Sequence, residues 1–235
     1  MRVALVTVGD ELLAGDTVNT NATWLGSRLA EQGATVERVT VVPDRLADIA
    51  RVVNEYHAEY DAVIVTGGLG PTHDDITMDG MAAAFGREVV TNEDALDWLE
   101  THGGYTREDL AEGTADMPAD ARMVPNRVGV APGCVIDSVY VLPGVPDEMK
   151  GMFAEIADEF EGARRYVETV EADEPESAML DRIRDVRERF DVKVGSYPGD
   201  PVRIKFESTD ESAVDAAAAW FRERVESPAD EGNQR

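Results

Sequence analysis

The stretch AVIVTGGLGPTHDDIT (62–77) decides the expected fold, because it joins an apolar strand to a glycine-rich turn and then to a helix. Residues 62–66 are Ala62 followed by four β-branched residues, as in strands that are buried on both faces. Three glycines and two adjacent aspartates follow, and a helix is predicted near 76–85. A glycine-rich turn at a strand end favours phosphate, whereas carboxylates repel it. The question is therefore which ligand would suit a loop that carries both glycines and carboxylates.

The same strand-to-helix order occurs twice before this stretch. VALVTV (3–8) predicts a buried strand, and helical spacing of apolar residues follows through 18–32. TVERVTVV (35–42) alternates like a strand, and Asp44 stands where the N-cap of the next helix is expected. Three alternations of strand and helix predict an α/β fold whose mostly parallel sheet is covered on both faces.

The middle of the chain has a less regular pattern. Residues 92–120 are polar and predict helix, broken at Gly103 and Gly104, whereas 121–142 predicts short strands split by 131–133. SVYVLPGVPDEM (138–149) predicts a strand, a proline-bracketed turn and a helix that runs to about 160. These elements complete a first domain of residues 1–162.

A second, smaller domain is expected at 163–227. Its pattern predicts the order β-α-β-β-α, with strands near 164–172, 192–198 and 202–208 and helices near 176–190 and 212–225. This order predicts a small α+β domain after the larger α/β one. The polar residues 228–235 are expected to form a disordered tail.

Charge is the outlying property of the composition. The chain has 48 acidic and 22 basic residues, a formal net charge of −26, and only three lysines. Because the acid is spread along the chain, we expect a halophilic adaptation of the whole surface to a salt-rich cytoplasm. Duplex binding requires a basic footprint, so nucleic acid is excluded as a partner.

The sequence also argues against an internal disulfide, a thiolate zinc cluster and membrane insertion. The single cysteine, Cys134, allows no internal disulfide and no thiolate zinc cluster, and it is interpreted as a small buried hydrophobe. The N-terminal apolar run meets Asp10 and Glu11 too early for a signal peptide or a membrane span. We therefore expect a cytoplasmic protein with no membrane partner.

The glycines of the loop 66–77 allow a ligand to approach the backbone closely. Gly67, Gly68 and Gly70 tolerate positive φ, and the N-terminus of the following helix favours an anion. Thr72 and Thr77 add hydroxyl donors or cap that helix. The alternative is a plain strand-to-helix turn. Neither GxGxxG nor GxxxxGK[ST] occurs, so the two common phosphate fingerprints are absent from the sequence.

The aspartates of the loop indicate a cation. Asp74 and Asp75 would repel a phosphate unless a hard divalent ion bridged both, as Mg²⁺ does in nucleotide enzymes. A solvated acidic pair is the alternative. Ligands of open α/β sheets collect where strands end, and acidic residues follow three predicted strands: Asp10, Glu11, Asp16, Asp44, Asp74 and Asp75. This recurrence favours the cation.

Several motifs together resemble one family. VGDELLAGDTVNTN, VPDRLADI, VTGGLGPTHDDIT, NRVGVAPG and LPGVPDEM stand in the order found in the molybdopterin-binding superfamily of MoaB and MogA, and most closely in the N-terminal domain of CinA-type competence/damage-inducible proteins. The resemblance covers nearly all of 1–160, and 163–227 resembles the family's middle domain. It implies a three-layer α/β/α fold and a homo-oligomer, either dimer or trimer. The family's C-terminal amidase domain has no counterpart in this sequence.

The resemblance implies a metal-dependent nucleotide pyrophosphatase that acts on ADP-ribose- or FAD-like substrates. Asp75, Asp74 and Asp44 would then be the metal ligands, for Mg²⁺ or else Mn²⁺ or Co²⁺, and Asp44 is alternatively the base that orients water. The phosphate- and nucleotide-binding candidates are Gly67, Gly68, Gly70, Thr72, Thr77, Asn21 and Asn126. His73 is either a general acid or a solvated side chain.

Two other interpretations stay open. In MogA-like relatives the same pocket binds molybdopterin and takes part in its adenylylation, so this chain is alternatively a molybdopterin-binding protein. The third interpretation is a non-catalytic nucleotide-binding module, because a fold does not by itself carry a chemistry.

Overall fold

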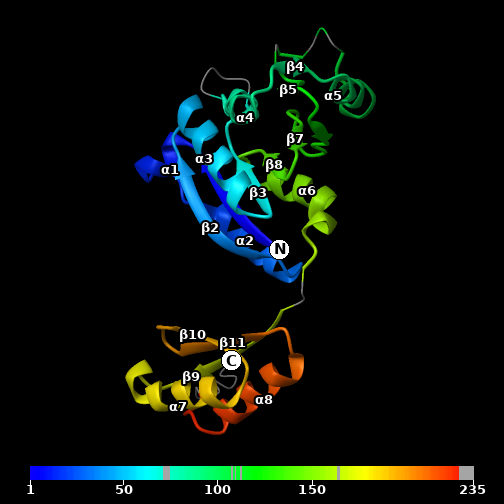
Figure 1. Cartoon of the computed structure of the whole chain (residues 1–235). Coiled ribbons are helices and arrows are strands. Elements are labelled where there is room, and N and C mark those ends of the chain that lie inside the picture. The colour runs from blue at the N-terminus through cyan, green and yellow to red at the C-terminus, as the bar shows by residue number, and fades with distance from the viewer. Residues whose placement is uncertain (71–74, 107, 109, 112, 163–164, 228–235) are drawn as a thin grey trace, which may run out of the picture. The chain divides into compact units, whose positions relative to one another are not determined.

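The computed structural model describes residues 1–70, 75–106, 108, 110–111, 113–162 and 165–227. Residues 71–74 of the glycine loop, with Thr72, His73 and Asp74, lie outside the described residues, as does the tail 228–235. The chain divides into two compact units, residues 1–162 and 163–235 (Figure 1), and each is described by itself.

A six-stranded sheet forms the middle layer of the first unit. Its strands are β1 (Arg2–Val8), β2 (Thr35–Val42), β3 (Ala62–Thr66), β6 (Arg122–Val124), β7 (Gly133–Ile136) and β8 (Val139–Leu142). They follow the order β2-β1-β3-β8-β7-β6. The first four of this order are parallel, whereas β7 is antiparallel to both of its neighbours. The predicted mostly parallel sheet is confirmed.

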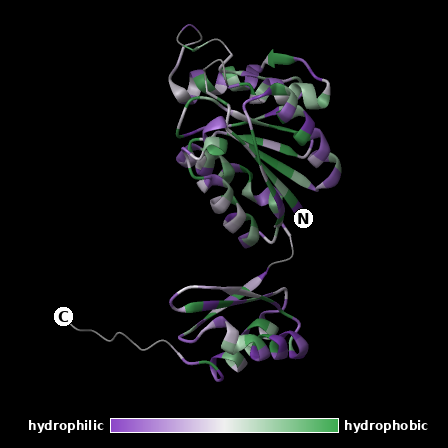
Figure 2. Ribbon diagram, turned by 90° about the vertical axis from the view of Figure 1, so that its left-hand side faces the viewer, coloured by the Kyte–Doolittle hydropathy of each residue, from purple (hydrophilic) through white to green (hydrophobic). Residues whose placement is uncertain are grey.

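Helices cover both faces of this sheet. The helices of this unit are α1 (Asp10–Ala14), α2 (Thr20–Glu31), α3 (Leu46–Glu59), α4 (Thr77–Phe85), α5 (Glu93–Trp98) and α6 (Pro146–Ile156), with a 3₁₀ turn at Ala157–Phe160, and α2 and α6 cover one face while α3 and α4 cover the other. Alternate residues of β1 enter separate cores: Leu5 belongs to the core with α2 and α6, and Val6 to the core with α3 and α4. The apolar sheet between two layers of helices (Figure 2) confirms the α/β/α architecture.

The segment 86–121 differs from the expectation. Two short strands, β4 (Val89–Thr91) and β5 (Asp116–Pro118), form an antiparallel pair. The helix α5 lies between them in the sequence and continues as a π-helix at Leu99–Gly103. The helical prediction for 92–120 was therefore right only for its first third. Strands of three residues are too short to show an alternating pattern, so sequence periodicity missed them.

The parallel strands end side by side at one edge of the sheet. In the ladder, Thr7 is opposite both Val41 and Thr66, and Thr66 is opposite Leu142. The turns that follow β1, β2, β3 and β8 are thereby gathered at that edge, as the glycine and proline turns of the sequence predict.

The second unit is a three-stranded antiparallel sheet with two helices. Its elements are β9 (Tyr166–Ala172), α7 (Glu176–Arg189), β10 (Lys193–Tyr197), β11 (Val202–Ser208) and α8 (Glu211–Arg222). The strand order is β10-β11-β9, with a separate core that includes Phe206 and Phe221. This unit has the predicted order β-α-β-β-α. Among the described residues of the chain, no helix has the length and apolar character that crossing a membrane requires.

Candidate functional site

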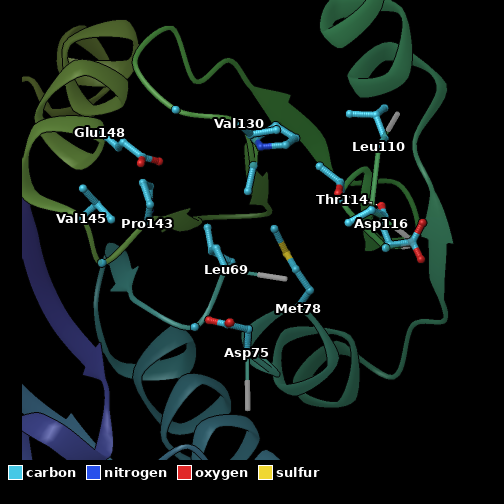
Figure 3. Close-up of a pocket in the computed structure, with 18 of the residues that line it drawn as sticks. Leu69, Asp75, Met78, Leu110, Thr114, Asp116, Val130, Pro143, Val145 and Glu148 are labelled. Carbon is cyan, nitrogen blue, oxygen red and sulfur yellow. Dashed lines mark hydrogen bonds between the residues drawn. The ribbon is translucent and has the colours of Figure 1, made fainter. Parts of the chain in front are cut away.

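A cavity of about 870 Å³ lies where β3 and β8 end. Four segments wall it: the glycine loop with the first turn of α4, the β4–β5 insertion, the loop 129–132, and the turn 143–145 together with Glu148 of α6 (Figure 3). Ligand pockets of proteins commonly have volumes of about 300–1,000 Å³. This cavity therefore has room for a dinucleotide-sized or pterin-sized molecule.

The lining of the cavity combines apolar side chains with carboxylates. Its apolar side chains include Leu69, Met78, Leu110, Val130 and Val145, and its carboxylates are Asp75, Asp79, Asp116 and Glu148. Within the described part of the chain, no lysine, arginine or histidine lines it. The cavity thus has a partly apolar lining, and all the charged side chains described in that lining are negative.

The basic residues of the neighbouring motifs form ion pairs elsewhere. Arg127 donates to Glu155 Oε1 at 2.8 Å, and this carboxylate raises the pKa of the guanidinium. Lys150 donates to Asp147 at 3.1 Å. Neither basic side chain lines the cavity. The two cations nearest in sequence to the late motifs therefore pair with acid outside the cavity.

Gly67 has a structural role at the end of β3. Its N–H donates to the carbonyl of Leu142 at 3.1 Å, and it does not line the cavity. Its φ is +101°, and a Cβ at this position would lie 2.3 Å from the carbonyl oxygen of Val8. Only glycine has the freedom to place the backbone here. Because its N–H is already bonded, Gly67 shapes the loop but offers no donor to a phosphate.

Gly68 and Gly70 do line the cavity. Gly68 has a φ of +66°, and a Cβ there would lie 2.3 Å from Thr77 Oγ1. A Cβ on Gly70 would lie 2.5 Å from Asp75 Oδ2. The backbone of the loop is therefore packed directly on the side chains at the start of α4, and Asp75 lines the same cavity (Figure 3).

Thr77 lies behind the glycine loop and is fully buried. Its N–H donates to the carbonyl of Gly68 at 3.2 Å, but its hydroxyl has no hydrogen-bond partner among the described residues. A buried hydroxyl without a partner costs about 1–3 kcal/mol. The N-cap residue of α4 is Ile76, whose apolar side chain makes no capping bond. Thr77 is the first residue of α4 and its hydroxyl makes no capping bond, so the capping role expected of Thr77 was wrong.

Asp44 lies apart from the cavity. Its Oδ2 accepts a hydrogen bond of 2.8 Å from the N–H of Asp10, at the start of α1. The N-cap of α3 is Arg45, which makes no side-chain capping bond, so the capping role predicted for Asp44 was wrong. The structure does not bring Asp44 into the lining that contains Asp75. Among the residues with described positions, no three His, Cys, Asp or Glu side chains form a metal-binding group.

Asn21 lines a second, smaller cavity of about 100 Å³. Its amide donates to the carbonyl of Gly144 at 2.7 Å, and its buried Oδ1 has no partner among the described residues. Gly144 lines both cavities, so Asn21 supports a turn that walls the main cavity without lining that cavity itself.

Asn126 is fully buried and every polar atom of its amide is bonded. Its Nδ2 donates to the carbonyl of Ala131 at 3.0 Å and to Glu148 Oε2 at 2.7 Å. Its Oδ1 accepts from the N–H groups of Val128, at 3.2 Å, and Gly129, at 2.8 Å. The side chain therefore has no donor left for a nucleotide, and it organises the loop that walls the cavity.

Sequence reasoning missed three of the four carboxylates. Glu148 stands inside the motif LPGVPDEM, which marked this turn without marking its glutamate. Asp79 faces the cavity from the first turn of α4. Asp116 lies on β5, whose existence the sequence did not indicate, and it accepts a hydrogen bond from Thr91 at 2.7 Å. The one sequence signal for these three carboxylates was the spacing of Asp79 from Asp75, because residues four apart lie on the same face of a helix.

These features define a class: an α/β protein with a cofactor-sized cavity at the carboxyl ends of its parallel strands. Residues 4–161 match the family model described as "Probable molybdopterin binding domain", and residues 164–229 match "FAD synthase, middle domain". The chain belongs to this molybdopterin-binding domain family and has the additional small domain after it.

Relatives support the resemblance to CinA proteins. A protein of Archaeoglobus fulgidus is 36% identical over 95% of this chain and 97% of its own length. A CinA-like protein of Citrifermentans bemidjiense is 43% identical over 66% of this chain, which corresponds to 39% of that protein. The crystal structure of CinA from Thermoplasma acidophilum, described as a protein of unknown function, is 37% identical with a TM-score of 0.62, covering 68% of this chain and 97% of that one. The predicted CinA-type resemblance is confirmed.

Proposed function

We propose that the cavity binds a dinucleotide pyrophosphate, such as ADP-ribose or FAD, together with a divalent cation, and that it hydrolyses the pyrophosphate linkage. The observation that carries this proposal is the lining, in which four carboxylates and no described cation surround a ligand-sized space. Two like charges about 4 Å apart repel by about 4 kcal/mol at an effective dielectric constant of about 20. A diphosphate would therefore enter this cavity only with a cation.

The residues present fit a hard divalent ion. Carboxylate oxygens are ligands that Mg²⁺ prefers, and Mg²⁺ is commonly held by one or two carboxylates plus substrate phosphates and water. Such a site needs no group of three protein ligands. Asp75 is the proposed ligand among the described residues, since it lines the cavity and Asp44 does not. When bound, Mg²⁺, Mn²⁺ or Co²⁺ would neutralise the diphosphate and acidify a water molecule.

The rest of the lining suits the other parts of such a ligand. Gly68 and Gly70 carry no side chain that would keep a phosphate from the loop, and the N-terminus of α4 lies behind them. Leu69, Met78 and Val130 supply apolar surface for a planar ring (Figure 3). The chain's own residues would thus place the diphosphate at the glycine loop and the ring on the apolar wall.

Exchange of one carboxylate tests this proposal. We expect the wild type to release product from ADP-ribose, FAD or NADH only with Mg²⁺, Mn²⁺ or Co²⁺, and Asp75→Asn to lower turnover by about a hundredfold or more while folding is kept. Asp181→Asn is the matched control, since Asp181 pairs with Arg184 on the exposed surface of α7. A wild type that hydrolyses none of these substrates with any of these metals would contradict the proposal.

Molybdopterin binding is the second candidate, and the description of the matching family model favours it. Under this proposal the same cavity holds a pterin, or takes part in its adenylylation, and the purified protein carries pterin fluorescence. A non-catalytic nucleotide-binding module would instead bind ADP-ribose tightly without a metal and release no product. We further propose a homo-oligomer, a dimer or a trimer, which light scattering on the purified chain measures directly.

A further inference from the structure

We propose that Glu148 accepts the proton of the water molecule that attacks the diphosphate, and that Asn126 is the positioning residue that holds the Glu148 carboxylate for this step. This inference rests on the proposed pyrophosphatase function and adds the group that activates water. It concerns the wall of the cavity formed by α6 and the loop 126–132, across from the predicted metal ligand Asp75.

Glu148 is a carboxylate that the cavity wall holds in place. It is half-buried in the first turn of α6 and points into the cavity (Figure 3). A Cβ on Gly129 would lie 2.2 Å from its carboxyl carbon and Oε2, so the loop backbone is packed directly on the carboxylate. No lysine or arginine of the described chain pairs with it. Its charge is compensated by one amide and by the start of a helix.

Asn126 bonds one oxygen of the Glu148 carboxylate and leaves the other without a partner among the described residues. It donates to Oε2 at 2.7 Å, and Oε1 accepts no hydrogen bond from the described residues. The other three bonds of the amide hold the loop 128–131, so the orientation of Asn126 is fixed by the backbone that it supports. A hydrogen bond to a charged group contributes about 1.5–3 kcal/mol, enough to favour one orientation of the carboxylate. Oε1, which would lie 2.5 Å from a Cβ on Gly129, is therefore the carboxylate oxygen that is left to accept a proton.

Hydrolysis of a diphosphate needs an acceptor for the proton of the attacking water. In hydrolysis the oxygen of water forms a bond to one phosphorus, the bridging P–O bond breaks, and its electron pair leaves with the departing phosphate. The proton that water releases goes to Glu148 Oε1 and then to solvent. A positioned base of this kind contributes about 10²–10⁴-fold to turnover. Asp75, which is assigned to the cation, has a different role from the base.

The variant Glu148→Gln separates this role from binding. Glutamine keeps the acceptor for Asn126 but cannot take a proton, so we expect kcat for Mg²⁺-dependent ADP-ribose hydrolysis to fall by about 10²–10⁴-fold with KM for ADP-ribose and for Mg²⁺ within about twofold. Glu155→Gln is the control, because Glu155 lies on the same helix and pairs with Arg127 outside the cavity. Turnover of this control should equal that of the wild type.

Asn126→Asp tests the positioning role. Aspartate can still accept from Val128 and Gly129, but it cannot donate to Glu148. We expect kcat to fall by roughly ten- to a hundredfold with KM nearly unchanged, and thermal unfolding to show that the variant is folded. A raised KM with normal kcat would mean that Asn126 only supports the loop, and would overturn its assignment.

The kinetic results distinguish the assignment of Glu148 as the base from the proposed hydrolase function. Unchanged kcat in Glu148→Gln, or a loss that excess Mg²⁺ restores, would overturn the assignment of Glu148 as the base while leaving the hydrolase intact. A wild type without turnover would overturn both proposals together.

Discussion

Replacing Gly67 by alanine tests whether the glycine loop depends on close approach between two backbones. The residue has a φ of +101°, and an added Cβ would lie 2.3 Å from the carbonyl oxygen of Val8 at the end of β1. Positive φ costs an L-residue about 1–2 kcal/mol, and overpacking a close-packed interior costs about 1–3 kcal/mol. Because β1 is paired with strands on both sides, Val8 has little freedom to move. We expect the free energy of unfolding of the first unit to fall by about 2–5 kcal/mol.

Alanine variants at two other glycines separate the cost of positive φ from the cost of the contact with Val8. Gly86, after α4, has a φ of +62° with nothing within 4 Å of an added Cβ, so Gly86→Ala should lose only the backbone part, about 1–2 kcal/mol. Gly26, inside α2, has open space and no positive φ. Gly26→Ala should therefore stabilise the helix by up to about 1 kcal/mol. The predicted order of stability is Gly26→Ala, wild type, Gly86→Ala and Gly67→Ala.

Urea unfolding measures this order. Trp24 and Trp98 belong to the first unit and Trp220 to the second. A Trp220→Phe background therefore makes the fluorescence report on the first unit alone. If Gly67→Ala lost no more stability than Gly86→Ala, the contact with Val8 would cost nothing and the reasoning would be refuted.

Two further predictions concern side chains outside the cavity. Arg182 donates to both carboxyl oxygens of Glu174, at 2.8 and 2.5 Å, and this pairing lowers the pKa of Glu174 below its usual value of 4.5. Arg182→Met should therefore lower the free energy of unfolding of the second unit by about 2 kcal/mol at pH 7, measured by the fluorescence of Trp220. A lowered folded-state pKa gives stability that is present above 4.5 and lost as pH falls through the folded value, so the difference between the two proteins should shrink below pH 4.5. Equal stabilities at pH 7 would contradict the pairing. Burial raises the pKa of the Cys134 thiol to about 12, so a thiol reagent at pH 8 should label it only in denaturant; rapid labelling of the native protein would contradict its burial.

Much of the fold could be predicted because the pattern of apolar residues along the sequence indicates which residues are buried. The runs 3–8 and 62–66 are mostly apolar and are buried at every position, and both lie in the sheet between two layers of helices. The glycine and proline turns marked the strand ends where the cavity lies. The hairpin of β4 and β5 left no such pattern, since each strand has three residues and pairs only with the other.

The arrangement of the site was harder to predict, because it depends on contacts between distant residues. Asp44 and Asp75 both follow strands of one sheet edge, yet Asp44 bonds to the N–H of Asp10 and Asp75 lines the cavity. Asn126 was expected to contact a nucleotide, but its bonds are made to its own loop and to Glu148, which is 22 residues further along the chain. Sequence order carries no information about which of two acidic side chains turns inward.

Coupling between a diphosphate and a divalent cation tests the central claim most directly. Calorimetric titration of the chain with α,β-methylene ADP-ribose, which cannot be hydrolysed, once with Mg²⁺ and once with EDTA, measures this coupling without turnover. Because the described lining of the cavity is acidic and carries no cation, binding should be strong with Mg²⁺ and at least about tenfold weaker in EDTA. By linkage, ADP-ribose should raise the affinity for Mg²⁺ by the same factor. Equal affinity in Mg²⁺ and EDTA would contradict the account.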